Sequence, residues 1–197
     1  MDIYFPSLPY QQQIVKILDD FTELEARKKE FNYWLKYLMQ NNNWINDKNY
    51  EYLKLGDICY FKIGQDMGIN SETVIYPIIA NIPKIYGYSG ASNCPACITI
   101  SRIGDVGDIS KYDTPIWLAI RVIALIIKCL TKVNQLYLYY YLKTLKSEFV
   151  KRANGAAQLN LSPINIENIA IPVPSLGNQE KIVNILNKFN NLTTNFQ

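Results

Sequence analysis

The first forty residues carry an apolar stripe with the period of a helix. Its members occupy two positions of a heptad repeat and are Ile14, Ile17, Phe21, Leu24, Phe31, Leu35 and Leu38. Lys28 is the only polar residue at a core position of this stripe. The stripe predicts a helix from about Gln11 to about Gln40, roughly 45 Å long at 1.5 Å per residue. Since such a helix is longer than a small domain, we favour a coiled coil over packing on the helix's own domain.

The chain contains an internal repeat. Residues 3–24 align without gaps with residues 171–192, and both copies share Pro-Ser-Leu, Gln, Ile-Val, Ile-Leu, Phe and Leu at matching places. Self-similarity at a fixed offset indicates one structural unit used twice. Each copy predicts an extended, proline-bearing segment and then a helix that begins near Gln11 or Gln179. The stripe of the second helix consists of Ile182, Ile185, Phe189, Leu192 and Phe196.

The segment between the two repeats has a different pattern of apolar residues. Short β-branched and aromatic runs, separated by Gly, Asn, Asp and Pro, predict strands within residues 52–64, 73–80, 96–104 and 116–127. Residues 135–152 predict a helix, because their basic C-terminal end suits the helix dipole and Asn154-Gly155 supplies a stop.

The predicted fold class is therefore α+β. A mostly β domain, residues 43–170, is inserted between residues 1–42, which carry the first repeat, and residues 171–197, which carry the second copy with a shorter helix. The flanking amphipathic helices are expected to form an antiparallel coiled coil or helical bundle.

Composition narrows the classes of function. The chain has 197 residues, 49% of them hydrophobic, which suits one domain plus an appendage. The formal net charge is only +3, so affinity for a polyanion must come from local placement of charge. The N-terminus has no secretory signal, and the apolar run 116–130 is too short for a membrane span and carries Arg121 and Lys128. We expect a cytoplasmic protein without a membrane segment.

The cysteines do not predict a metal site. Of Cys59, Cys94, Cys97 and Cys129, only Cys94 and Cys97 are close in sequence, and the chain has no histidine. A zinc site would need two further ligands, and a thioredoxin-like dithiol would need a strand-to-helix junction. We therefore expect reduced thiols that pack as small hydrophobic groups.

No catalytic motif is present. Histidine, the commonest general base, is absent, and there is no glycine-rich phosphate loop, no HExxH and no GxSxG nucleophile elbow. The Asn/Asp-Pro-Pro-Tyr motif of adenine-N6 methyltransferases is missing as well. We expect a binding protein and no enzyme.

Four motifs together resemble the specificity subunits of type I restriction-modification systems. They are the twice-used PSLxxQxxIVxILxxF, LGDI at 55–58 followed by Gly64, ITISRIGDVG at 98–107, and GAAQLNLS at 155–162 ahead of the second repeat. Each motif is weak alone, but their order spans nearly the whole chain.

The resemblance implies how such a chain functions. A full subunit of this family has two target-recognition domains, each of which reads half of an interrupted DNA site, and an antiparallel coiled coil that docks two modification subunits. This chain resembles a half-length form with one domain. Its implied partners are double-stranded DNA, modification subunits, restriction subunits and a second copy of itself through the two stripes. S-adenosylmethionine, ATP and magnesium would belong to partner subunits. The alternative is a truncated interaction protein that occupies modification subunits and blocks their specificity.

Candidate DNA contacts lie in the loop-like parts of the domain. Base edges are read by Arg, Lys, Gln and Asn, and phosphates are held by Lys, Ser, Tyr and backbone amides. Any one such residue is more often an ordinary solvated side chain, so their clustering carries the prediction. The candidates are Lys62, Gln65, Lys84, Tyr86, Tyr88, Ser89, Asn93, Arg102, Lys111, Tyr112, Asn154, Gln158 and Asn160.

Overall fold

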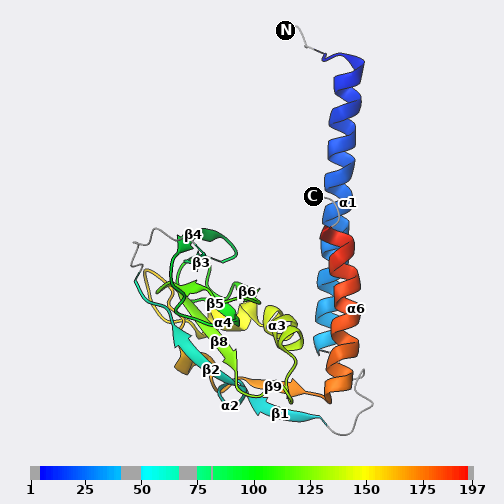
Figure 1. Ribbon diagram of the computed structural model, residues 1–197. Helices are drawn as coiled ribbons and strands as arrows, with labels where there is room; N and C mark the ends of the chain where they lie inside the picture. Colours follow the sequence, from blue (N-terminus) through cyan, green and yellow to red (C-terminus); the bar gives the residue numbers. More distant parts are fainter. Residues whose placement is uncertain (1–4, 41–49, 67–74, 81, 195–197) are drawn as a thin grey trace.

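A long helix and a shorter one stand beside a β-rich domain (Figure 1). The computed structural model describes residues 5–40, 50–66, 75–80 and 82–194. Helix α1 (Leu8–Gln40) leads to the domain, and α6 (Leu176–Thr194) leaves it and runs antiparallel along α1. The predicted α+β class with flanking helices is thus confirmed. No helix in the described part of the chain is long and apolar enough to cross a membrane.

The largest sheet of the domain is antiparallel and has the strand order β2-β8-β5-β6. Its strands are β2 (Cys59–Ile63), β8 (Val122–Ile127), β5 (Cys97–Ser101) and β6 (Ile109–Tyr112). Every residue of β5 is buried, as is typical of a strand that is covered on both faces.

Two smaller sheets complete the described part of the domain. One has the order β4-β3-β7, from β4 (Ile85–Ser89), β3 (Tyr76–Ile79) and β7 (Trp117–Leu118), and β3 pairs with β7 in parallel. The other pairs β1 (Glu51–Lys54) with β9 (Ala170–Val173), which places the first residues of the second repeat inside the domain. Residues 116–127, predicted as strand, divide into β7 and β8 around a turn.

Short helices divide other predicted segments. The strand expected over residues 52–64 is interrupted by one helical turn, α2 (Leu55–Ile58). The helix expected over 135–152 is broken at Leu145 into α3 (Gln135–Thr144) and α4 (Lys146–Arg152), and α5 (Pro163–Ile166) precedes β9. Asn134 caps α3, because its Oδ1 accepts from the backbone N–H groups of Leu136 and Tyr137.

The main core lies between the large sheet and α3 and α4. Ile98, Ile100, Ile123 and Leu125 from the sheet pack with Leu138, Leu142 and Phe149 from the helices, all fully buried. This buried cluster holds the sheet and the helices together, so the loops at the rim start from well-packed strand ends.

The helix pair has its own core, at its domain end. Phe31, Leu35 and Leu38 of α1 pack on Ile182, Val183 and Leu186 of α6 and on Tyr137 and Tyr140 of α3. Trp34 stacks on Phe189 with ring centroids 5.7 Å apart. This half of the predicted heptad stripe is therefore satisfied within one chain; the side chain of Leu192 lies outside the described residues.

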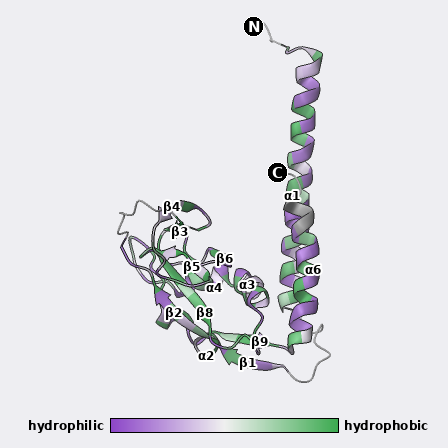
Figure 2. Ribbon diagram, in the orientation of Figure 1, coloured by the Kyte–Doolittle hydropathy of each residue, from purple (hydrophilic) through white to green (hydrophobic). Residues whose placement is uncertain are grey.

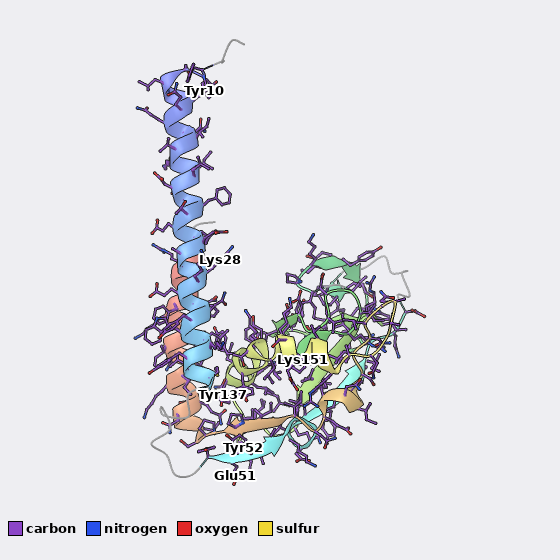
Figure 3. The ribbon with its side chains drawn as sticks, turned by 180° about the vertical axis from the view of Figure 1, so that it is seen from behind. Tyr10, Lys28, Glu51, Tyr52, Tyr137 and Lys151 are labelled. Carbon is purple, nitrogen blue, oxygen red and sulfur yellow. The ribbon has the colours of Figure 1, made fainter. Side chains whose placement is uncertain are left out.

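We call residues 8–27 of α1 its free half. This half has no helix packed along it among the described residues. Figure 1 shows α1 extending beyond the end of α6, and Figure 3 labels Tyr10 at its free end and Lys28 near the level at which α6 ends. Apolar residues are interspersed along this half (Figure 2), and Ile14, Ile17 and Phe21 are 49%, 47% and 62% exposed. An apolar face of this length is unusual on a soluble monomer and marks an interaction surface.

Candidate nucleic-acid interface

Four loop segments meet where β2 and β5 end and β8 begins. The N–H of Gly64 donates to the carbonyl of Val122 over 3.1 Å, that of Arg102 to Arg121 over 3.0 Å, and that of Leu161 to Arg102 over 2.9 Å. We call residues 64–66, 102–104, 119–121 and 154–160 the loop edge. In Figures 1 and 3 the chain after α4 runs along the side of the domain away from α1 and α6. The loop edge is therefore open to a large partner.

The segment after α4 forms a tight loop. Asn154 and Asn160 exchange backbone hydrogen bonds of 3.0 and 2.7 Å. Gly155 has φ +123, and a Cβ there would lie 2.1 Å from the carbonyl oxygen of Gln158, so only glycine fits. Every residue from 154 to 160 is exposed, which presents the side chain of Gln158 to solvent.

Arg102 fastens this loop to the turn before β8. Its Nε and Nη2 donate to Asn160 Oδ1 over 3.3 and 3.0 Å, and its Nη1 donates to the carbonyl of Ile120 over 3.3 Å. Gln65 joins the same turn through a bridge to Ala119. Five sequence candidates are thereby brought together from separate stretches of the chain: Gln65, Arg102, Asn154, Gln158 and Asn160.

A second group of candidates lies on the β3–β4 hairpin. Tyr86 and Tyr88 of β4 are 62% and 53% exposed, and Lys84 directly before the strand is exposed too. Ser89 Oγ accepts from the N–H of Ala91 over 3.2 Å. Because β3 pairs with β7, whose chain continues into residues 119–121, the hairpin is mechanically joined to the loop edge.

Two candidates serve the domain's own structure. Asn93 donates from Nδ2 to the carbonyl of Leu118 over 3.0 Å and accepts from its N–H over 2.7 Å, as a strand neighbour would. Lys62 Nζ donates to the carbonyl of Asn93. Both side chains are half-buried, and part of their hydrogen-bonding capacity serves the domain itself.

Lys111 and Tyr112 lie apart from the loop edge. Both are on β6, where Tyr112 faces Cys97 at the start of β5, the end opposite the loop edge. Lys111 forms an ion pair with Asp113, and burial raises the pKa of Tyr112. The thirteen candidates thus divide between the loop edge, the hairpin, the domain's interior and β6.

Sequence reasoning missed one member of the loop edge. Arg121 lies in the turn between β7 and β8. In the sequence it interrupts an apolar run, and there it served only as an argument against a membrane span. The Ala-Ile-Arg-Val stretch gives no turn signal, so only the pairing of β3 with β7 and of β5 with β8 reveals the turn.

The cysteine pair lies inside the domain. The sulfur atoms of Cys94 and Cys97 are 3.7 Å apart and both residues are buried. Their contact lowers the pKa of the Cys94 thiol and raises that of Cys97. No group of three His, Cys, Asp or Glu residues suited to a metal occurs among the described residues. The absence of bound zinc stays a prediction.

Solved structures of type I restriction-modification subunits have a similar fold. The crystal structure of the HsdS subunit from Thermoanaerobacter tengcongensis superposes with a TM-score of 0.66 over 93% of this chain and 48% of its own, at 19% identity. The S subunit of a type I restriction-modification system from M. genitalium gives 0.62 over 74% of this chain and 40% of its own, at 20% identity. At such identities the likeness concerns the fold.

Sequence relatives agree. The EcoR124I/EcoR124II specificity subunit of Escherichia coli is 26% identical over 95% of this chain and 53% of its own length. The Mycoplasma pneumoniae protein S.MpnORF89P, provisionally named a type I specificity subunit, is 27% identical over 93% of this chain and 62% of its own length. The chain thus spans less than two thirds of these relatives. Because the model of the family described as "Type I restriction modification DNA specificity domain" matches residues 36–197, the chain belongs to that family.

Proposed function

We propose that this chain recognises one half of a double-stranded DNA site in a type I restriction-modification system, with the loop edge as its reading surface. The observation that carries the proposal is the convergence of Gln65, Arg102, Asn154, Gln158 and Asn160 on one exposed rim of a domain of the specificity family. Arginine, asparagine and glutamine are the side chains that pair bidentately with guanine and adenine edges.

The charge of the chain supports reading by local contacts. A net charge of +3 gives no broad field to hold DNA, so the loop edge and the hairpin must supply both phosphate and base contacts. The exposed Tyr86, Tyr88 and Lys84 on the hairpin suit phosphates beside the bases that the loop edge reads.

Chemistry on the DNA is delegated to other chains. The chain lacks histidine, the Asn/Asp-Pro-Pro-Tyr motif and a glycine-rich cofactor loop, so a separate modification subunit would flip and methylate an adenine with S-adenosylmethionine. The helix pair is the natural dock for such a subunit, and ATP and magnesium would serve a restriction subunit. In this scheme the chain itself holds no cofactor.

Two copies would pair through the free half of α1. The repeat supports this, because the second copy buries the residues that the first copy exposes. Ile182 and Leu186 are 5% and 0% exposed, whereas their counterparts Ile14 and Leu18 are 49% and 59% exposed. A sequence that is packed in one copy is suited to packing in the other, and it gains by leaving water.

The pairing surface is narrower than the heptad stripe suggests. Phe31, Leu35 and Leu38 already pack within the chain, so the stripe residues left for pairing are Ile14, Ile17, Phe21 and the half-buried Leu24, with the exposed Leu18 beside them. Antiparallel pairing of two free α1 halves would carry the two domains to opposite ends of one rod. Two-fold symmetry in the protein would then require a palindromic, interrupted site.

Selection of bound duplexes from a random pool tests the proposal. The full chain is used alone and together with modification subunits, and the enriched sequences are compared. Enrichment of a defined half-site supports DNA reading. Binding to modification subunits without any enriched motif, in either arm, contradicts it and favours a chain that blocks those subunits.

A further inference from the structure

Arg121 differs from the other three arginines of the chain. Arg27 donates to Glu23, Arg152 to Glu148, and Arg102 to Asn160 and Ile120. Arg121 donates to no acceptor within residues 5–40, 50–66, 75–80 and 82–194, although its Nε is shielded from solvent. A shielded donor without an acceptor is rare in native structures and requires an explanation.

The backbone around Arg121 is fixed. Its carbonyl accepts from the N–H of Arg102 over 3.0 Å, and the N–H of Val122 donates to Ala119 over 3.0 Å to close the turn. The guanidinium lies against Gly104, because a Cβ on that residue would be 3.0 Å from Arg121 Nη2. Gly104 has φ +86, a conformation that side chains disfavour, so the space is kept open for the guanidinium.

The surroundings contain amides and another guanidinium but no ion-pair partner. Arg102 and Asn160 lie on the two adjoining loops, and Gln65 is bridged to Ala119 two residues before Arg121. Neither Asp66 nor Asp105, the carboxylates of the flanking loops, forms an ion pair with Arg121 in the described part of the chain. The Arg121 guanidinium is thus held in position, but the described residues provide no acceptor for its N–H groups.

We infer that Arg121 is a specificity-determining residue that reads a guanine of the half-site through O6 and N7. The inference rests on the proposed DNA-reading function. The backbone of Arg121 is fixed, its guanidinium lies in the space beside Gly104, and its terminal N–H donors are unused. Such a group suits a planar base edge with two acceptors. A phosphate contact would need only a flexible point charge, which a lysine supplies. Arg102 holds the loops in place, and Arg121 makes the contact.

The first test compares selected motifs. The full chain is tested as wild type, as Arg121→Lys and as the matched control Arg27→Lys on α1, with thermal unfolding measured for each. Arg121→Lys is expected to lose guanine preference at one position by roughly 5- to 150-fold and to keep preferences elsewhere. A uniform loss of affinity at all sequences with a shallower salt dependence would identify a phosphate contact and overturn the inference.

The second test changes the DNA and compares the response of the wild type with that of Arg121→Lys. Each guanine of the selected half-site is replaced by 7-deazaguanine, which lacks the N7 acceptor, and binding of the wild-type chain is measured. One guanine should prove sensitive, and Arg121→Lys should no longer respond to that replacement. If no guanine is sensitive, or if the variant responds as the wild type does, the inference fails while DNA reading stands. If the wild-type chain selects no motif at all, the proposed function itself fails.

Discussion

Gln179 donates from Nε2 to the carbonyl of Pro174 over 2.7 Å, and Gln11, at the matching place of the first repeat, donates to Pro6 over the same 2.7 Å. Their wider surroundings differ. Gln179 is fully buried, donates also to Lys132 and accepts from the N–H of Asn134, whereas Gln11 is exposed. The described part of the first repeat therefore shares this local geometry with the second, but the domain that covers the second repeat does not cover it.

This difference predicts unequal costs for the same substitution. Gln179→Ala should lower the free energy of unfolding by about 2–4 kcal/mol, because the buried carbonyl of Pro174 and the part-buried N–H of Asn134 and carbonyl of Lys132 would all lose their partner. Gln11→Ala should cost under about 1 kcal/mol, since water replaces its exposed hydrogen bond. Urea titrations at low protein concentration measure both, and equal losses would show that the first repeat is also covered.

The periodic parts of the fold were predictable from sequence, since α1, α3 and α6 follow their apolar stripes. Helices α1 and α6 begin at Leu8 and Leu176, three residues before the predicted starts at Gln11 and Gln179. The difference arises because proline is tolerated in the first turn of a helix. The short strands β4 and β6 were missed because neither shows an alternation of apolar and polar positions. Strand β4 contains Gly87 and exposed tyrosines, and β6 contains polar residues.

The candidate site was predictable by residue type but not by position. The Asn154-Gly155 pair predicts a loop and Arg102 follows a predicted strand, so the sequence places both in loop-like parts of the domain. The position of Asn93 was not predictable, because an asparagine can complete a sheet from inside and nothing in Ser-Asn-Cys-Pro indicates its hydrogen bonds to Leu118. Arg121 was missed because its turn is imposed by strand pairing and not by local sequence.

Lys62 and Lys84 should respond differently to neutralisation. Lys84→Gln is expected to lower the magnitude of the salt slope of DNA binding by about 0.9, with stability unchanged within about 0.5 kcal/mol. Lys62→Met should leave the slope unchanged and cost about 1–2 kcal/mol of stability, because it removes the donor that Asn93 accepts from. Binding assays at several salt concentrations and urea unfolding decide this, and the reverse pattern would place the DNA face at Lys62.

Tyr140 should make the attachment of the helix pair sensitive to alkali. Its hydroxyl donates to Asn187 Oδ1 over 2.7 Å, and burial raises its pKa from 10.0 to about 12. Because the unfolded chain loses this proton first, the stabilisation is complete below pH 10 and is lost as pH rises towards about 12.

Tyr140→Phe should cost about 1 kcal/mol at pH 7 and should flatten the loss of stability above pH 10. Urea midpoints from pH 7 to pH 11 measure both effects. Tyr10→Phe, at the exposed end of α1, serves as the control and should change neither. Curves for Tyr140→Phe and wild type that fall in parallel above pH 10 would contradict the assignment.

The free half of α1 should hold two copies together. Leu18 and Phe21 are 59% and 62% exposed in the single chain, so replacing both with aspartate removes apolar surface from a partner without opening the chain's own core. Two carboxylates at the centre of a small apolar interface should raise the dissociation constant by at least about 100-fold. Gln12→Asp, on the opposite face of the same helix at about 100° per residue, adds a similar charge and should leave association intact.

Light scattering at micromolar concentration separates the outcomes. A dimer for the wild type and for Gln12→Asp, with a folded monomer for Leu18→Asp, Phe21→Asp, is the expected result, and circular dichroism should show unchanged helix in all three. A wild-type monomer would mean that this face meets a different chain. Because the face lies far from the loop edge, the monomeric variant should still enrich one half-site, whereas the wild type should enrich that half-site and its inverted copy at a fixed spacing. A dimer that selects a non-palindromic site would show that the two copies do not pair symmetrically.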